Sequence, residues 1–446
     1  MDLTPLLALL VFSVSTPNDV PPPQIKISYE KYVLTENGLE VILSEDHSLP
    51  IVAVNIWYHT GAVNEELGRT GFAHLFEHLM FQGSKNVGDD QHLRLLDAAG
   101  ASEVNGTTSF DRTNYFETVP SNQLALALWL ESDRMGFLLD ALTQKKFDNQ
   151  RDVVMNERRQ TVDNYPYGIS DERLVQLLFP PDHPYYGNVI GSMVDIAAAT
   201  IDDVRDFYTR YYAPANATLA IVGDIDIAKT KALVAKYFAT LPQRQTPTIR
   251  KIETPILKNE ERVIIKEPVQ LPRVAYAWLS PAAYQDGDAD CDIIAFILGN
   301  GHASRLYQKL VYELQLAQEV SVGQASNYLT SIFRIEVIGR PGVDIKRLEA
   351  EIQKVIDEIR STPASAQEIE RARNQLVTEM VAYLQKIGDL NGKADTLNRY
   401  NQYINKPDYF NEDLARYQRI TPSSVLNVAK EVLNSTARAV VITVPK

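Results

Sequence analysis

Residues 54–62 read VNIWYHTGA and residues 275–283 read AYAWLSPAA, so a shift of 221 positions places Trp57 on Trp278. The same shift aligns positions near the ends of both halves: Thr200, Val204, Leu219 and Ile221 fall on Thr421, Val425, Val440 and Ile442. One offset therefore matches the start and the end of each half, as expected for an internal repeat. We predict an α+β fold of two tandem homologous domains, each a mainly antiparallel sheet packed by helices.

The repeat also sets the domain boundaries. We expect the first domain at residues 26–241 and the second at residues 256–446. Between them, residues 242–255 (PQRQTPTIRKIETP) have three prolines and the polar composition of an interdomain linker. Near the start of the first domain, Asn37-Gly38 lies between two alternating apolar runs, which is a strong hairpin signal. Helical periodicity begins at Phe72.

Residues 1–25 are typical either of a secretory signal or of a disordered tail. An apolar run from Leu6 to Phe12 precedes small residues at Ser13 and Ser15, but the initial MDLT contains no Lys or Arg. We expect an exported, periplasmic protein, with a cytoplasmic location as the alternative. Because the run is too short to span a bilayer stably and no later stretch comes close, we expect no stable membrane span.

Composition excludes some classes of partner and site. The 446-residue chain carries a net charge of -13. This argues against a nucleic-acid partner, because phosphate backbones are bound through basic patches. The single cysteine, Cys291, excludes an internal disulfide, and its apolar surroundings (CDIIAFIL) predict a buried, unreactive thiol. The acidic run DGDAD, residues 286–290, reads as a solvated loop.

Residues 71–84, GFAHLFEHLMFQGS, place two histidines and a glutamate within five positions. Side chains four positions apart lie on one helix face, so His74 and His78 can direct ring nitrogens at one metal ion. Glu77 would flank that ion, where a carboxylate can take a proton from metal-bound water. The order His-x-x-Glu-His is the inverse of the commoner zinc-protease motif. The alternative is a polar helix face that binds no metal.

The repeat distinguishes these two interpretations. The shift of 221 positions places His74, Glu77 and His78 on Ala295, Leu298 and Gly299. A cluster that the fold required would have an equivalent in the second domain, which instead has apolar and small residues there. We therefore interpret the cluster as functional and the second domain as a degenerate copy without zinc ligands.

Several longer motifs resemble those of a known family. NGLEVILSED, GAVNEE, GFAHLFEHLMFQGS, VNGTTSFDRTNYFETVP and RDVVMNERRQ are similar to sequences of the M16 metallopeptidases, the pitrilysin-like and insulysin-like inverted zincins. The shorter members that resemble processing peptidases are the most similar, and the resemblance extends over the chain from about residue 30. It implies that the chain forms half of a clamshell and is a zinc endopeptidase for short or unfolded peptides.

The resemblance also assigns roles to individual residues. Within RDVVMNE it implies Glu157 as the third Zn²⁺ ligand beside His74 and His78, with Glu77 as the general base. The family has an auxiliary glutamate seven positions before the third ligand. This chain has Gln150 there, so the contribution of that carboxylate is lost or weakened.

Substrate contacts follow from two further motifs. SEVNGTTSFD resembles the family's active-site edge strand, which holds substrate as an added strand, and Asn105 matches its asparagine. Asn105-Gly106 also reads as a turn. In the family the second domain supplies an arginine and, seven residues later, a tyrosine, which bind substrate and help stabilise the oxyanion. In RLYQKLVYELQLAQEV this chain has Val311 and Gln318 at those positions.

The missing arginine and tyrosine imply either an impaired enzyme or a homologous partner chain that supplies the pair. Because the zinc residues are retained, we expect a heterodimer. A homodimer in which Tyr307 or Tyr312 fills in is the alternative. Two other functions stay open: a non-catalytic structural or assembly subunit, and a peptidase that processes one specific precursor.

Overall fold

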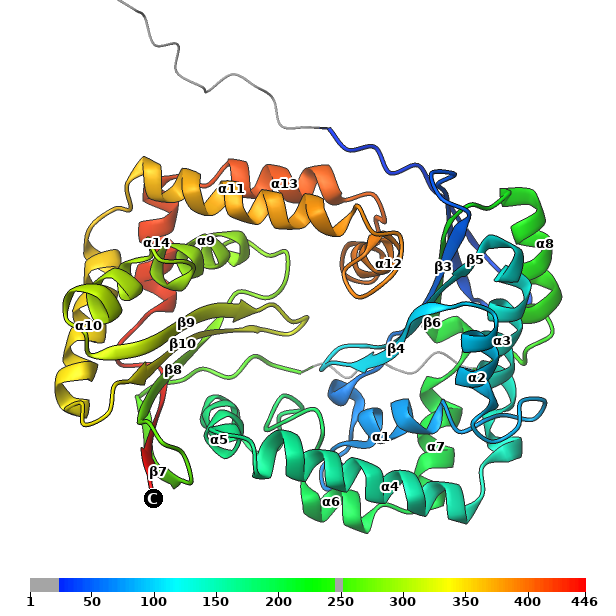
Figure 1. Cartoon of the computed structure of the whole chain (residues 1–446), viewed down its shortest axis with the longest axis horizontal. Coiled ribbons are helices and arrows are strands. Elements are labelled where there is room, and N and C mark those ends of the chain that lie inside the picture. The colour runs from blue at the N-terminus through cyan, green and yellow to red at the C-terminus, as the bar shows by residue number, and fades with distance from the viewer. Residues whose placement is uncertain (1–23, 245–251) are drawn as a thin grey trace, which may run out of the picture.

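The computed structural model describes residues 24–244 and 252–446, which form two sheets of similar topology covered by helices (Figure 1). The α+β prediction is confirmed. Residues 1–23 of the predicted signal or tail and residues 245–251 of the predicted linker lie outside the described residues.

Within residues 24–244 the first sheet has six strands in the order β1-β2-β6-β3-β5-β4, and β2 and β6 are its one parallel pair. The strands are β1 (Glu30–Val33), β2 (Glu40–Glu45), β3 (Ile51–Tyr58), β4 (Ser102–Thr108), β5 (Thr113–Pro120) and β6 (Ala217–Gly223). The predicted hairpin joins β1 to β2. Gly38 in its turn has a φ of 84°, a left-handed conformation that glycine adopts without steric cost.

Within residues 252–446 the second sheet has five strands in the order β7-β11-β8-β10-β9, with β7 and β11 as its one parallel pair. The strands are β7 (Glu261–Glu267), β8 (Arg273–Ser280), β9 (Ala317–Ala325), β10 (Ser331–Gly339) and β11 (Ala439–Pro445). Trp57 on β3 and Trp278 on β8 occupy the same place in the two sheets, and both are buried.

Helices repeat in the same way. The first half contains α1 (Phe72–Leu79), α2 (Gln91–Ala98), α3 (Leu124–Ala141), α4 (Gln144–Arg158), α5 (Gly168–Leu178), α6 (Met193–Ala198), α7 (Ile201–Tyr211) and α8 (Ile227–Phe238). The second contains α9 (Asp288–Gly299), α10 (Ile345–Ser361), α11 (Ala366–Tyr383), α12 (Lys393–Ile404), α13 (Phe410–Gln418) and α14 (Pro422–Val432). Thr200 caps α7 and Thr421 caps α14, in each case by accepting from a backbone N–H of the first turn. The predicted duplication is confirmed.

Each half contributes one helix to the other half's sheet. Helix α5 of the first half packs on the second sheet, where Leu174 joins an apolar cluster with Ala275 and Val441. Helix α12 of the second half packs on the first sheet, where Leu397 joins a cluster with Ala53. Figure 1 shows α12 beside the strands of the first half and α5 beside those of the second. The exchange interlocks the two halves, because separating them would expose both apolar surfaces.

Buried polar contacts fix where α12 docks. The Asp395 carboxylate accepts from Trp57 Nε1 at 2.8 Å and from Asn114 Nδ2 at 3.0 Å. Asn398 Nδ2 donates to the backbone oxygen of Asn55 at 3.0 Å. All five residues are buried, so each polar group depends on its partner, and a different docking of the helix would leave them unsatisfied.

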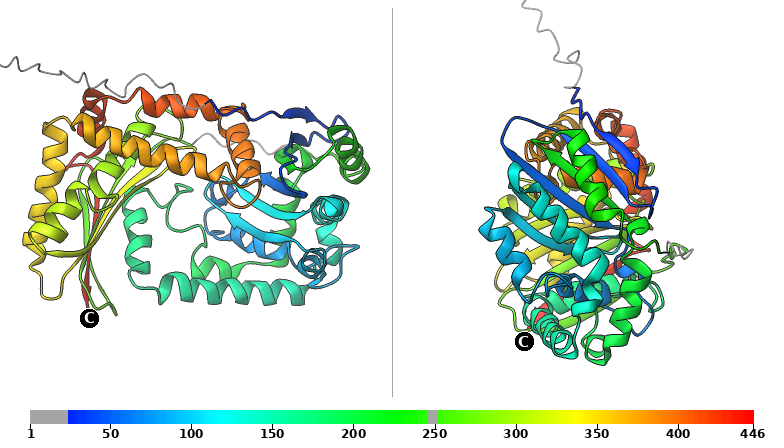
Figure 2. Two further views of the ribbon diagram at one scale, coloured as in Figure 1. Left: turned by 45° about the horizontal axis from the view of Figure 1, so that its top comes forward. Right: turned by 90° about the vertical axis from the view of Figure 1, so that its right-hand side faces the viewer.

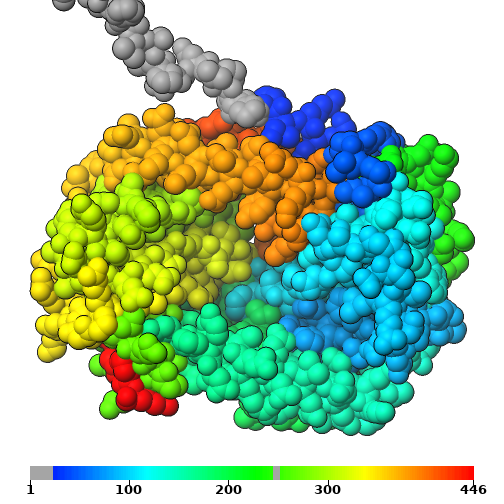
Figure 3. All heavy atoms as spheres, in the orientation of Figure 1, coloured from blue at the N-terminus to red at the C-terminus, as the bar shows by residue number. Residues whose placement is uncertain are grey.

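The two halves together form half of a clamshell. From the side of the first half, α8 lies in front of the blue strands (Figure 2). The space-filling view is hollowed near its centre, between residues of the first half in cyan and residues of the second half in yellow and orange (Figure 3). Of the helices within residues 24–244 and 252–446, none combines the length and apolar character that crossing a bilayer needs.

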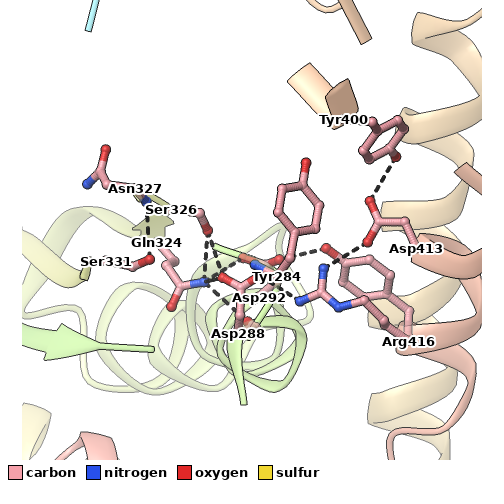
Figure 4. A network of polar contacts seen from close by, with 11 residues as sticks. Tyr284, Asp288, Asp292, Gln324, Ser326, Asn327, Ser331, Tyr400, Asp413 and Arg416 are labelled. Atoms are coloured by element: carbon pink, nitrogen blue, oxygen red, sulfur yellow. Dashed lines mark hydrogen bonds and ion pairs between the residues drawn. The ribbon is translucent and has the colours of Figure 1, made fainter. Parts of the chain in front are cut away.

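The acidic run at residues 286–290 is not the solvated loop that the sequence suggested. Asp288 is the first residue of α9 and is 4% exposed. Its carboxylate accepts from Arg416 Nη2 at 2.6 Å and from the backbone N–H of Tyr284 at 2.9 Å (Figure 4). The expectation was wrong because Arg416 reaches Asp288 from α13, which is distant in the sequence. Cys291, on the same helix, is buried as predicted.

Candidate metal centre

Helix α1 carries His74, Glu77 and His78, and its apolar residues determine how it packs. Its buried side chains lie in the core of the first half; they are Phe72, Leu75, Phe76 and Leu79. The two histidines are partly exposed on the remaining surface, with 13% of the His74 side chain and 22% of the His78 side chain accessible to solvent.

A glutamate from the preceding loop caps this helix. Glu65 Oε2 accepts from the backbone N–H of Gly71 at 3.0 Å, and Glu65 Oε1 accepts from that of Ala73 at 2.8 Å. The first N–H groups of a helix have no partner within it, so Glu65 satisfies donors in the turn that carries His74. Gly71 has a φ of 86°, and a Cβ there would lie 2.4 Å from the backbone oxygen of Ile190.

Helix α4 brings Glu157 to the two histidines. Glu157 Oε2 lies 3.2 Å from His78 Nε2, and Glu157 Oε1 lies 3.7 Å from His74 Nε2. One ligand atom from each of the three residues falls within 4.8 Å of the others. Atoms bound to one zinc ion at about 2.0–2.1 Å are themselves roughly 3 to 4 Å apart, so both histidine–glutamate distances lie in the range that a shared zinc ion requires.

The protonation states of these groups also suit a metal. Burial, helped by the neighbouring His78, lowers the pKa of His74 to about 4 and keeps its imidazole neutral, which is the form that binds metal. The hydrogen bond with His78 lowers the pKa of Glu157, so this carboxylate is ionised at neutral pH.

Glu77 lies between α1 and strand β4. Its side chain is buried, and Oε2 accepts from Thr108 Oγ1 at 2.5 Å. A Cβ at Gly106 would lie 3.2 Å from Glu77 Oε1 and 3.1 Å from Glu77 Cγ, so the glycine lets the strand approach the carboxylate closely. Burial raises the pKa of Glu77, and a carboxylate with a raised pKa is a better proton acceptor.

Strand β4 is the last strand of the first sheet, and it borders the same cleft as His74 and Glu77. Asn105 and Gly106 lie inside this strand, opposite Phe116 and Tyr115 on β5, so the turn interpretation of Asn105-Gly106 is wrong. The Asn105 side chain is exposed, and its Oδ1 accepts from the backbone N–H of Gly106 at 2.9 Å. An edge strand has unpaired backbone groups, which is what addition of a peptide strand requires.

Gln150 lies on α4, seven positions before Glu157, and lines the same cleft. Its side chain is buried, with 6% of the residue exposed. The position that the family resemblance pairs with an auxiliary glutamate is therefore next to the cleft but uncharged.

The equivalent helix of the second half carries apolar and small residues in place of the metal-binding cluster. Ala295, Leu298 and Gly299 lie on α9, where β9 packs directly against the helix. A Cβ at Gly299 would lie 2.2 Å from Val322 Cγ2, so a histidine has no room there. Among residues 24–244 and 252–446, His74, His78 and Glu157 are the one group of three or more His, Cys, Asp or Glu residues that could hold a metal.

Val311 and Gln318 lie in the second half, and neither side chain carries a charge. Val311 is in a π-helical turn, Tyr307–Glu313, and packs against the second core. Gln318 is exposed near the start of β9. Tyr307 stacks on His302 with ring centroids 4.7 Å apart, whereas the Tyr312 side chain is 72% exposed.

Sequence reasoning missed Glu65, Gly106 and Thr108. Gly106 and Thr108 stand beside Asn105 in the motif SEVNGTTSFD, but their contacts with Glu77 depend on the packing of β4 against α1. Glu65 lies in the motif GAVNEE, but it precedes the helix by a loop, so the motif does not indicate that Glu65 caps the helix.

Comparison with known proteins gives matches to both halves of the chain. The family model for insulinase (peptidase family M16) matches residues 40–179, and the model for the peptidase M16 inactive domain matches residues 198–376. The zinc protease PqqE of Helicobacter pylori is 28% identical over 93% of this chain and 92% of its own length. The second match includes most of the half that lacks metal ligands.

Solved structures share the fold. A protease from Helicobacter pylori matches with a TM-score of 0.87 and 26% identity, over 94% of this chain and 100% of that chain. The periplasmic protease PqqL from Escherichia coli matches with a TM-score of 0.74 and 20% identity, over 94% of this chain but 48% of that chain. This chain therefore corresponds to about half of the longer molecule.

Proposed function

Because this chain belongs to the M16 family of metallopeptidases, we propose that it is a zinc-dependent endopeptidase that cleaves short or unfolded peptides. The observation that carries the proposal is the convergence of His74, His78 and Glu157 beside the buried carboxylate of Glu77. The name of the relative PqqE, a zinc protease, supports the choice of metal.

In this proposal His74, His78 and Glu157 hold the zinc ion. When bound, zinc supplies Lewis acidity, which polarises the scissile carbonyl and lowers the pKa of a water molecule beside it. Glu77 takes a proton from the attacking water and returns it to the leaving amine. Thr108 donates to Glu77 Oε2, which keeps the carboxylate oriented and leaves Oε1 toward Gly106 as the proton-accepting atom.

The substrate lies along β4 as an added strand. Asn105 and the backbone of β4 contact it, and hydrogen bonds to peptide backbone place few demands on its sequence. This suits an enzyme that accepts varied unfolded peptides. Gln150 is uncharged, so Glu157 is the carboxylate that α4 contributes to the lining of the cleft.

Turnover by the purified chain tests the proposal. We expect hydrolysis of a quenched peptide mixture to need both zinc and Glu77, so Glu77→Gln should retain zinc and lose turnover by about 100-fold or more. Turnover that survives Glu77→Gln would refute the assigned base. A chain that binds no zinc would instead favour the structural or assembly subunit. Cleavage of a single precursor with no activity on the mixture would favour the specific processing peptidase.

We further propose that a homologous partner chain completes the site. Val311 and Gln318 stand where the family resemblance expects an arginine and a tyrosine, and the match to about half of PqqL supports the pairing of two such chains. The partner would supply the Arg/Tyr pair in a heterodimer. A periplasmic location, like that of the periplasmic protease PqqL, is part of the same proposal.

The partner requirement can be tested within one chain. If the lone chain lacks only this pair, the double variant Val311→Arg with Gln318→Tyr should gain turnover of about 100-fold, the scale of one oxyanion donor. Single variants should gain less. Full activity of the unmodified chain that is lost in Tyr312→Phe would support the homodimer instead, because Tyr312 is the exposed tyrosine of that segment.

A further inference from the structure

A cavity of about 370 Å³ lies where the two halves meet. Residues of both halves line it, including Trp57 and Arg112 from the first half and Asp395 and Arg399 from the second. It adjoins the candidate metal cleft, because Arg112 Nη1 donates to the backbone oxygen of Thr107 at 2.9 Å and Thr107 lines that cleft. A peptide on the β4 edge would therefore reach the cavity at the Thr108 end of the strand.

Most charged groups of this cavity are already paired. Figure 4 shows Arg416 between Asp288 and Asp413, with nitrogen–oxygen distances of 2.6 Å and 2.8 Å. Asp288 also accepts from Gln324 Nε2 at 2.9 Å, and Asp413 accepts from the Tyr400 hydroxyl at 2.8 Å. The carboxylates of Asp288 and Asp413 therefore already accept hydrogen bonds from other side chains of the protein.

The other two carboxylates that line the cavity also accept hydrogen bonds from the protein. Asp395 accepts from Trp57 Nε1 and Asn114 Nδ2 through one oxygen and from the backbone N–H of Asn391 at 3.0 Å through the other. Asp292, on the α9 side, accepts from the Tyr417 hydroxyl at 2.8 Å. The acceptors that line the cavity thus have partners.

Two guanidinium groups, by contrast, keep unused donors. Arg112 makes its hydrogen bonds through Nη1 alone, and its guanidinium lies 5.1 Å from the centre of the Trp57 ring. Arg399 makes one long bond, from Nη1 to Asn391 Oδ1 at 3.4 Å, and its buried Nε has no partner. Within residues 24–244 and 252–446 neither forms an ion pair with a carboxylate, unlike Arg416 in the same cavity.

The unused N–H donors of these two guanidinium groups indicate which kind of ligand the cavity binds. A guanidinium has five N–H donors and no acceptor, and its planar fork matches a carboxylate. We propose that Arg112 and Arg399 bind a carboxylate of the peptide ligand, from its C-terminus or from an acidic side chain, as a specificity subsite beside the metal cleft. Met380, Tyr383 and Leu390 line the same cavity and would contact the apolar part of that residue. The inference rests on the proposed peptidase function.

Binding measured without turnover tests the subsite. The full chain with Glu77→Gln is titrated against three fluorescein-labelled peptide pools with randomised flanks. The first pool has an internal Glu and a free C-terminus, the second has Gln instead of Glu, and the third has an amidated C-terminus. We expect one neutral pool to bind about 10-fold more weakly, because charge-assisted hydrogen bonds are lost. Which pool is weakened identifies the source of the carboxylate.

Two arginine variants in the same background locate the effect. Arg399→Gln should abolish the difference between pools. Arg347→Gln removes the same charge at an exposed site on α10 and should preserve the difference. Equal affinity for all pools, including no binding by any, overturns the inference, as does a preference that survives Arg399→Gln. Hydrolysis of the same pools is scored separately with the unmodified chain and with the double variant Val311→Arg with Gln318→Tyr. Cleavage without carboxylate preference refutes only the subsite, and preference without cleavage by either protein refutes only the peptidase proposal.

Discussion

Replacing Glu65 by alanine removes the cap of the helix that carries the metal-binding histidines. The carboxylate accepts from two backbone N–H groups, those of Gly71 and Ala73, at 3.0 Å and 2.8 Å. Each such bond contributes about 1 kcal/mol, and a lost helix cap costs a similar amount, so we expect unfolding to be easier by about 2 kcal/mol. That corresponds to roughly a 30-fold change in the unfolding equilibrium.

The same variant should weaken zinc binding more than a general loss of stability would. His74 lies in the first turn of α1, and groups that orient metal ligands typically change affinity by about 10-fold or more. The assays are urea unfolding of the metal-free chain and zinc competition against a chelating dye. Glu66→Ala is the matched control, since Glu66 pairs with Arg210 on the surface and contributes about 0–1 kcal/mol. If Glu65→Ala matches Glu66→Ala in both assays, the capping argument is wrong.

Three further outcomes are expected. Gly106→Ala places a Cβ 3.1 Å from Glu77 Cγ, so kcat should fall about 10-fold with zinc content unchanged; unchanged kcat would show that Glu77 tolerates the shift. Gln150→Glu should raise zinc affinity about 10-fold in the dye competition, because it adds a carboxylate beside the site, and no gain would argue against a role for that position. The ion pair with Lys393 lowers the pKa of Asp46 from its ordinary 3.8 to about 2, so Asp46 stabilises the fold above about pH 4 and loses this effect as the pH falls toward 2. The urea midpoint of Asp46→Asn should therefore lie below that of the unmodified chain at pH 7 and converge with it on acidification; a constant difference would contradict the assignment.

Much of the architecture could be predicted because the repeat appears in the residues themselves. Trp57 and Trp278 occupy equivalent buried strands, and the capping threonines of α7 and α14 are separated by the same 221 positions. Local sequence patterns also predicted the turn at Gly38 and the helix that begins at Phe72. Each of these features depends on residues close together in the sequence or on one constant offset.

What the sequence could not reveal depends on contacts between distant segments. An amphipathic pattern shows that α5 and α12 each have an apolar face, but not that each covers the sheet of the other half. The burial of Asp288 depends in the same way on Arg416, and the cavity between the halves on Arg112 and Arg399. Polar residues of this kind read as surface residues until the packing of the two halves is known.

The central claim is that His74, His78 and Glu157 form one zinc centre. The most direct measurement is the zinc content of the purified chain after dialysis against limiting zinc, compared with Glu157→Gln and with Asp152→Asn, which removes an exposed carboxylate from the same helix. We predict about one zinc per chain for the unmodified protein and for Asp152→Asn, and a loss of at least about 10-fold in affinity for Glu157→Gln. Zinc bound equally well by Glu157→Gln, or absent from the unmodified chain, would contradict the assignment of the centre.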